Sequence, residues 1–352
     1  MSTPIEDYAV IGNCETLALV ARAGSIDWLA MPRFDSASCF AALLGDPSHG
    51  RWLISPVAPT AQVTRRYRGD TLILETLFET PDGAVCVIDF MSRREGCSDL
   101  VRLVRGVRGS VAMRTELVVR FDYGDVVPWV ARREDGCLQL AAGPDRLLLH
   151  TSVKLRGRGS RTVGEFLVGA GDEVSFTLSY SPSYLSSPEP PNAARTLDHV
   201  ETRWSDWASA FKPMGEWSEA VRRSLLTLKA LAHWQTGGIV AAGTTSLPEK
   251  IGGPRNWDYR YCWLRDATLT LYALLGAGFV QEAGAWREWL VRAVAGDPAK
   301  VQIMYGVAGE RRLEEFELPG LPGYENSAPV RVGNAAAGQV QLDVYGEVID
   351  AL

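Results

Sequence analysis

The chain has 352 residues, of which 46% are hydrophobic and 22% charged, and its formal net charge is -6. This length can bury one large core or two ordinary ones, so we expect two globular domains. An acidic chain lacks the basic field that a nucleic-acid backbone attracts, which excludes nucleic acid as an expected partner.

The N-terminus and the cysteines bear on location and on metal binding. The first ten residues have neither a basic nor a long apolar stretch, and no segment has the roughly 20 apolar residues that span a bilayer. We therefore expect a cytoplasmic protein with no membrane partner. The cysteines are scattered and have no histidines nearby, which predicts reduced core thiols and no metal site. They are Cys14, Cys39, Cys86, Cys97, Cys137 and Cys262.

From about residue 8 to 185, short runs of alternating apolar residues predict antiparallel strands. The clearest hairpin covers residues 72–91 and turns at Pro81, Asp82 and Gly83. Such strands without long helices between them favour a large sandwich. Further strands are expected at 100–122, 138–141, 146–155 and 164–180.

A segment rich in proline and serine, 181–191, cannot continue a sheet or a helix. We place the domain boundary there. The predicted domains are an N-terminal one over 1–185, a linker with a connecting helix over 186–214, and a C-terminal one over 215–352.

In the C-terminal domain the apolar period becomes helical, and we predict an all-α fold. Val221, Leu225, Leu228 and Ala232 fall on one face, and residues 266–275 and 280–295 also predict helices. Glycines 276, 278 and 296 stand where these helices should stop and suit left-handed helix ends. The last fourteen residues predict a helix that is apolar on two sides and so expects neighbours on both.

The densest group of chemistry-bearing residues is WDYRYCWLRD at 257–266, with four aromatics, two arginines and two aspartates. Sugar rings stack on aromatic faces, and their hydroxyls need charged or amide partners, because burying an unpaired one costs about 1 to 3 kcal/mol. This loop therefore suits a sugar. On residues alone, Asp266 could simply cap its helix, Arg265 could simply pair with a carboxylate, and the aromatics could be core.

The chain contains GTTSLPEK at 243–250 and NWDYRYCWLRD at 256–266. These two segments resemble the start of the catalytic domain of the glucoamylases and trehalases of bacterial type in glycoside hydrolase family 15, and the similarity is to the N-terminal portion of these enzymes. The resemblance extends over both halves of the chain. Its other segments are 12–14, 24–28, 32–35, 331–339 and 341–346.

The resemblance implies an antiparallel β-supersandwich followed by part of an (α/α)6 barrel. It also implies cleavage of α-glucosidic bonds from the non-reducing end, with no metal or organic cofactor. Arg265 and Asp266 would bind hydroxyls of the terminal glucose, and Trp257, Tyr259 and Trp263 would line its pocket. The 331–339 loop would supply another wall, although alone it could equally be a turn that caps a helix.

Members of the family hydrolyse with inversion, using a general acid and a general base whose carboxyls stand roughly 6.5 to 9.5 Å apart. In the family's order both would fall after Leu352, so we leave the catalytic residues unassigned. A twelve-helix barrel needs roughly 200 residues, and 215–352 could hold about the first third to half of it. We therefore expect a chain that stops before the catalytic glutamates.

Local carboxylates are weaker candidates for catalysis. The glutamates between 310 and 317 are typical of a solvated face, whereas Asp343 and Glu347 on the final helix are slightly better placed. Two other classes stay open, a non-catalytic carbohydrate-binding fragment and a glycoside phosphorylase. The choice among trehalose, maltodextrin and isomaltodextrin also stays open, as does the oligomeric state.

Overall fold

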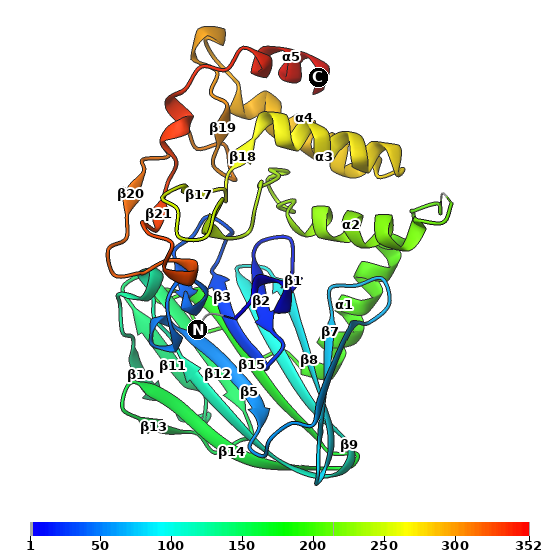
Figure 1. The fold of residues 1–352 in the computed structure, drawn as a ribbon, viewed down its shortest axis with the longest axis vertical. Coiled ribbons are helices and arrows are strands. Elements are labelled where there is room, and N and C mark those ends of the chain that lie inside the picture. The colour runs from blue at the N-terminus through cyan, green and yellow to red at the C-terminus, as the bar shows by residue number, and fades with distance from the viewer. Residues whose placement is uncertain (1–2, 214, 352) are drawn as a thin grey trace. The chain divides into compact units, whose positions relative to one another are not determined.

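The structure, a computed structural model, describes residues 3–213 and 215–351. It divides into two compact units (Figure 1). The first holds most of the chain up to Ser205. The second begins at Asp206 and also includes two short segments from the N-terminal part, Cys14–Thr16 and Arg33–Asp35.

The first unit is built from two antiparallel sheets that are joined by one strand, β9 (Cys97–Val118). One sheet contains β1 (Tyr8–Gly12), β2 (Leu17–Ala21), β3 (Ser25–Ala30), β4 (Ser38–Phe40), β5 (Arg51–Pro56), β13 (Arg156–Arg158) and β14 (Arg161–Gly169). The other contains β6 (Gln62–Tyr67), β7 (Leu74–Thr80), β8 (Gly83–Arg94), β10 (Trp129–Arg132), β11 (Leu138–Ala142), β12 (Asp145–Thr151) and β15 (Glu173–Pro182).

Strand β9 changes partners along its length. Its first half pairs with β8 and β15, and its second half pairs with β5 and β14. Glycines lie where the change occurs: Gly109 has a φ of +65°, and a Cβ on Gly106 would lie 1.8 Å from the carbonyl oxygen of Gly169. Only glycine allows so close an approach of two backbones.

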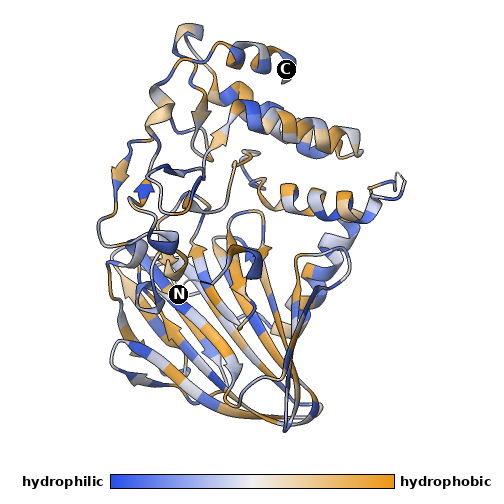
Figure 2. Cartoon of the chain, viewed as in Figure 1, coloured by the Kyte–Doolittle hydropathy of each residue, from blue (hydrophilic) through white to orange (hydrophobic). Residues whose placement is uncertain are grey.

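Alternating side chains create one core in this unit. Hydrophobic and hydrophilic residues alternate along many of its strands (Figure 2). The inward residues of both sheets, among them Trp52, Val104 and Phe176, form a single buried cluster. The predicted antiparallel β unit is therefore confirmed, and so is the hairpin at 72–91, which is β7 and β8 joined through Pro81 and Asp82.

One predicted strand, 164–180, is wrong in detail. The chain turns between Gly169 and Glu173, so that β14 and β15 are separate strands that both pair with β9. Gly171 has a φ of +86° in this turn, a conformation that glycine adopts without steric cost. Because apolar residues alternate on both sides of this turn, the sequence pattern does not show where the strand ends.

The predicted helices are confirmed, with small shifts at their ends. Helix α3 contacts α2, α4 and α5. Gly278 and Gly296 take positive φ after α3 and α4, as expected for helix ends, whereas Gly276 is the last residue of α3 and its expected left-handed conformation is wrong. The helices are α1 (Ala193–Ala208), α2 (Ser218–Ala230), α3 (Leu264–Gly276), α4 (Val280–Ala293) and α5 (Asp343–Ala351).

The expectation of an all-α second half is wrong, because three small two-stranded sheets lie among its loops. Strands of two to four residues show no periodicity and pair segments that are far apart in sequence. The pairs are β16 (Thr245–Pro248) with β17 (Asn256–Asp258), β18 (Cys262–Trp263) with β19 (Met304–Tyr305), and β20 (Phe316–Glu317) with β21 (Arg331–Val332).

The final helix also differs from the expectation. It begins only at Asp343, and Val340 and Leu342 before it are 80% and 83% exposed. Within α5, Val344 is buried whereas Ile349 is exposed, so one of the two apolar faces has neighbours in the described part of the chain.

The expectations about the cysteines, membrane spans and metal ligands can be compared with the structure of the described residues. All six cysteines are unpaired, and all but Cys86 are buried. Within 3–213 and 215–351, no helix has the length and apolar character needed to cross a bilayer, and no three metal-ligating side chains of the His, Cys, Asp and Glu types gather around a point.

Candidate functional site

A buried ion pair fixes the aromatic loop of residues 256–266. Asp258 and Arg260 are both 0% exposed, and Nη2 of Arg260 lies 2.8 Å from Oδ2 of Asp258. Nε of Arg260 donates to Oδ1 at 2.9 Å, and the hydroxyl of Tyr261 donates to Oδ2 at 3.3 Å. Because both charges are satisfied by each other inside the protein, they hold the loop in shape.

Strand β21 and the residues after it connect three of the segments that carry the family resemblance. Thr245 Oγ1 and Ser246 Oγ donate to the carbonyl oxygen of Arg331 at 2.6 and 2.9 Å. Asn334 Nδ2 donates to the carbonyl oxygen of Asp258 at 2.9 Å. Segments 243–250, 256–266 and 331–339 therefore meet in space.

These segments surround a pocket of about 390 Å³. Its volume lies within the range of roughly 300 to 1,000 Å³ that small-molecule sites occupy. Aromatic rings, carboxylates, a guanidinium and amides share the lining, which is the mixture of surfaces that a sugar needs. The lining residues are Glu249, Arg255, Trp257, Tyr259, Trp263, Glu315, Asn334, Ala335, Ala336 and Gln339.

Three of the five predicted binding residues, Trp257, Tyr259 and Trp263, lie together in this lining. The rings of Tyr259 and Trp263 are 6.1 Å apart between centroids, with their planes at 49°. The guanidinium of Arg331 lies over the ring of Trp257, 4.6 Å from its centroid. Nε1 of Trp263 is buried and has no hydrogen-bond partner, so the wall holds an unsatisfied donor.

The phenol of Tyr259, one of the lining residues, has a raised pKa. Burial raises the pKa of its phenol, and the negative charges of Glu249 and Asp266 act in the same direction. Asp266 itself is not part of the lining.

The other two predicted residues, Arg265 and Asp266, lie at the start of α3 with side chains 45% and 49% exposed. Nη1 of Arg265 lies 3.2 Å from Oδ2 of Asp343, so Arg265 does pair with a carboxylate. The simpler interpretation of Asp266 as a helix cap is wrong. The helix begins at Leu264 after an N-cap at Trp263, which places Asp266 within the first turn.

Sequence reasoning missed several polar residues of the lining. Glu249, Asn334 and Gln339 fall inside segments that carry the resemblance, but nothing in their spacing shows that they face a cavity. The run of charges around Glu315 predicts a solvated side chain, but Glu315 lines the pocket. It accepts a hydrogen bond from the backbone of Ala335 at 3.0 Å and lies 3.4 Å from Nε of Arg331.

We do not assign a catalytic acid and base among the remaining acidic candidates. Asp343 is engaged with Arg265, and Glu310 lies 2.9 Å from Nη2 of Arg33. Burial opposes the ionisation of Glu310, but backbone hydrogen bonds and Arg33 outweigh it and lower its pKa. Glu347 is half-buried on α5.

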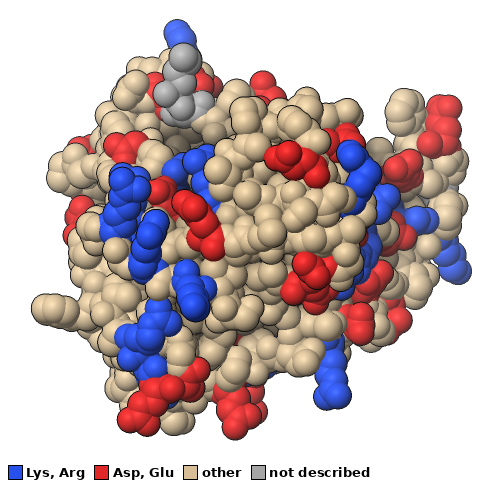
Figure 3. Space-filling view, turned by 90° about the horizontal axis from the view of Figure 1, so that it is seen from below, with Lys and Arg blue, Asp and Glu red and all other residues tan. Residues whose placement is uncertain are grey.

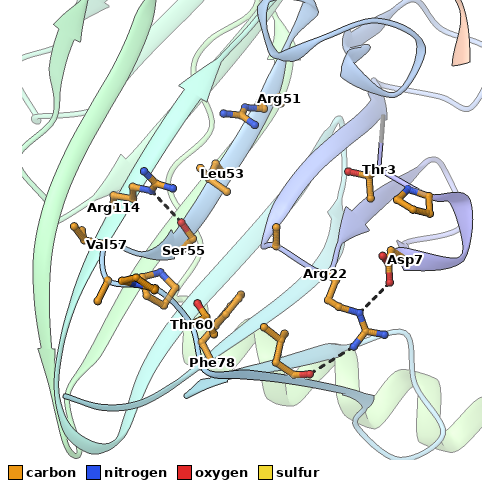
Figure 4. Close-up of a pocket in the computed structure, with 16 residues that line it drawn as sticks. Thr3, Asp7, Arg22, Arg51, Leu53, Ser55, Val57, Thr60, Phe78 and Arg114 are labelled. Atoms are coloured by element: carbon orange, nitrogen blue, oxygen red, sulfur yellow. Dashed lines mark hydrogen bonds and ion pairs between the residues drawn. The ribbon is translucent and has the colours of Figure 1, made fainter. Parts of the chain in front are cut away.

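A larger open pocket in the first unit, of about 770 Å³, is a poorer sugar site. Figure 4 shows that Arg22 already pairs with Asp7 and that Arg114 donates to Ser55. Among the described residues that line it, Phe78 is the one aromatic, and its ring is buried. The pocket therefore lacks an open aromatic face.

Comparison with known proteins gives matches in both halves of the chain. Residues 215–352 match the model of glycosyl hydrolases family 15, and residues 1–155 match the model described as trehalase-like, N-terminal.

Curated relatives match nearly the whole chain. A trehalase of Mycolicibacterium smegmatis is 35% identical, with 99% of this chain and 56% of the relative covered. Trehalase 1 of Sulfolobus acidocaldarius is 34% identical, with 97% and 58% covered. The chain thus spans about half the length of the relatives that it matches.

A solved structure of a bacterial glucoamylase complexed with acarbose has a TM-score of 0.60 at 12% identity, covering 88% of this chain and 53% of that one. At this identity the likeness concerns the fold, a large antiparallel sheet part followed by a helical part.

Proposed function

The chain belongs to glycoside hydrolase family 15, and on that premise we propose that the protein carrying it hydrolyses α-glucosidic bonds from the non-reducing end of its substrate. Trehalose is the substrate that we propose first. The support is that relatives in bacteria and archaea, which match over nearly the whole chain, are trehalases.

The observation that carries this proposal is the composition of the pocket in the second unit. Three aromatic rings and the polar groups of Glu249, Arg255 and Gln339 face one cavity of about 390 Å³. The rings would contact the apolar face of a glucose, and the polar groups would bind its hydroxyls, since unpaired buried hydroxyls are costly.

Arg265 and Asp266 would bind hydroxyls of the terminal glucose from beside this pocket. The pair between Arg265 and Asp343 is about half exposed on both sides. Exposed ion pairs contribute little free energy, about 0 to 1 kcal/mol, so a sugar hydroxyl can compete for the guanidinium.

Helices α2 to α5 would form part of an (α/α)6 barrel that follows the β unit in the sequence. The reaction would invert the configuration at the anomeric carbon. We propose that the acid and the base come from sequence beyond residue 352. The described part then supplies binding groups that position the scissile bond between them.

Activity of the full-length protein on trehalose, maltose and isomaltose tests the proposal. An inverting hydrolase first releases β-glucose from maltose, which proton NMR distinguishes from α-glucose within minutes. We expect trehalose to give α- and β-glucose in equal amounts, because only one of its two rings undergoes inversion. Cleavage only in the presence of phosphate would indicate a phosphorylase, and binding without cleavage would indicate a carbohydrate-binding protein.

A further inference from the structure

Arg120, at the end of β9 in the first unit, is a buried cation without a counter-ion. Its side chain donates to the carbonyl oxygen of Val119 at 2.7 Å and to Oγ of Ser160 at 2.8 Å, and the residue is 7% exposed. These acceptors are neutral. In the described part of the chain, no carboxylate pairs with Arg120.

An uncompensated buried charge is unfavourable, so it needs an explanation. Burial lowers the pKa of Arg120, and the positive charge of Arg161 acts in the same direction. A bound anion would relieve both effects.

Arg120 lines a cavity of about 390 Å³ whose lining combines an apolar group and a polar group of residues. In the apolar group, Leu117, Val119 and Leu140 come from the core, and Val127 and Val130 are exposed. The polar group contains the cation Arg120, two residues with hydroxyls, two glycines and Arg161, whose guanidinium pairs with Glu116 at 3.1 Å. Its residues are Arg120, Gly157, Gly159, Ser160, Arg161 and Thr162.

The charge around the polar group is positive although the whole chain is acidic. Glu116 is shared by Arg51 at 2.8 Å and Arg161 at 3.1 Å, so one carboxylate serves two guanidiniums and Arg120 has none. Residues 154–161 hold four cations, and no acidic residue occurs between Asp145 and Glu165. Basic and acidic side chains are both exposed on the face of the molecule that Figure 3 shows.

We propose that this cavity binds a small organic anion with an apolar body. A carboxylate or phosphate head would accept hydrogen bonds from Arg120, with Arg161 adding positive charge nearby, and the apolar body would lie against Val127 and Val130. An inorganic anion would use only the polar group, and a neutral aromatic molecule only the apolar group. The site is separate from the sugar pocket, whose lining belongs to the second unit.

Calorimetric titration of the full-length protein with four probes tests this inference. Phenyl phosphate and phenylacetate carry both features, whereas inorganic phosphate and benzyl alcohol carry one each. We expect the better of the two aromatic anions to bind about tenfold more tightly than either single-feature probe, and that anion then identifies the preferred head group. Equal affinity for inorganic phosphate, or no binding of both aromatic anions, overturns the proposal.

Variants separate a binding role of Arg120 from a structural one. Arg120→Met should weaken the aromatic anion about tenfold, and Arg120→Lys should restore part of the affinity because it keeps the charge. Arg161→Gln gives the same readout if Arg120→Met does not fold. Arg114→Gln, on β9 but outside the cavity, should leave the affinity unchanged. Full affinity in both Arg120→Met and Arg161→Gln would show that these arginines only support the loop.

Discussion

Asn334 donates a hydrogen bond from Nδ2 to the carbonyl oxygen of Asp258 at 2.9 Å, joining two segments that are 76 residues apart in the chain. The same side chain accepts a hydrogen bond through Oδ1 from the backbone of Ala336 at 3.0 Å. One buried amide thus fixes both the aromatic loop and the opposite wall of the pocket.

Asn334→Asp should therefore loosen the pocket. The carboxylate can still accept from Ala336, but it replaces the amide donor with an acceptor that faces a carbonyl oxygen. We expect a loss of about 1 to 3 kcal/mol in the free energy of unfolding, measured by urea denaturation. Gln339→Glu, a matched amide-to-acid change at an exposed position of the same lining, should cost much less. Equal effects would argue against the bridging role.

Tyr259→Phe removes a hydroxyl that has no hydrogen-bond partner among the described residues. If this hydroxyl binds the sugar, kcat/KM of the full-length enzyme should fall about 2- to 12-fold, the effect of one neutral hydrogen bond. Tyr272→Phe, which changes an exposed tyrosine of α3 outside the lining, is the control. Identical kinetics for both variants would remove Tyr259 from the sugar site.

Arg265→Ala should lower kcat/KM by about 100-fold while changing stability little, because a charged hydrogen bond to the transition state is lost from a half-exposed side chain. Asp343→Asn tests the alternative that the ion pair alone matters. It breaks the pair but leaves Arg265, and should change kcat/KM less than about threefold. A wild-type rate for Arg265→Ala would contradict the assigned role.

Glu116 should make the first unit sensitive to acid. Burial opposes its ionisation, but hydrogen bonds from Arg51 and Arg161 outweigh this and lower its pKa below the ordinary 4.5. Its contribution to stability is therefore complete above pH 4.5 and is lost as the pH falls through the lowered value.

Urea unfolding at pH 5.5 and at pH 3.5 measures this contribution. The wild type should lose more stability between the two pH values than Glu116→Gln, which has no carboxylate to protonate. Glu165→Gln, on the neighbouring strand, should behave like the wild type. The same pH dependence in all three proteins would show that Glu116 is not responsible.

Periodicity predicted elements that have several turns or several alternations. Helix α4 and the hairpin of β7 and β8 lie where expected, because burial of one face sets their period. Elements that depend on distant partners were not predictable. Strand β18 has two residues, and it is defined by pairing with Met304 and Tyr305, some forty residues later.

The same distinction applies to the candidate site. Trp257, Tyr259 and Trp263 stand out in the sequence because aromatic residues cluster within one short loop. Glu315 does not stand out, since it belongs to a run of charges that resembles an ordinary solvated face. Its place in the lining results from its contact with Arg331, which no local pattern shows.

Strand β9 has a mechanical consequence for the first unit. Since one continuous strand is an interior member of both sheets, neither layer can slide past the other without tearing hydrogen bonds along that strand. The two layers should therefore open together, and slow amide exchange should extend along β9 from one layer into the other.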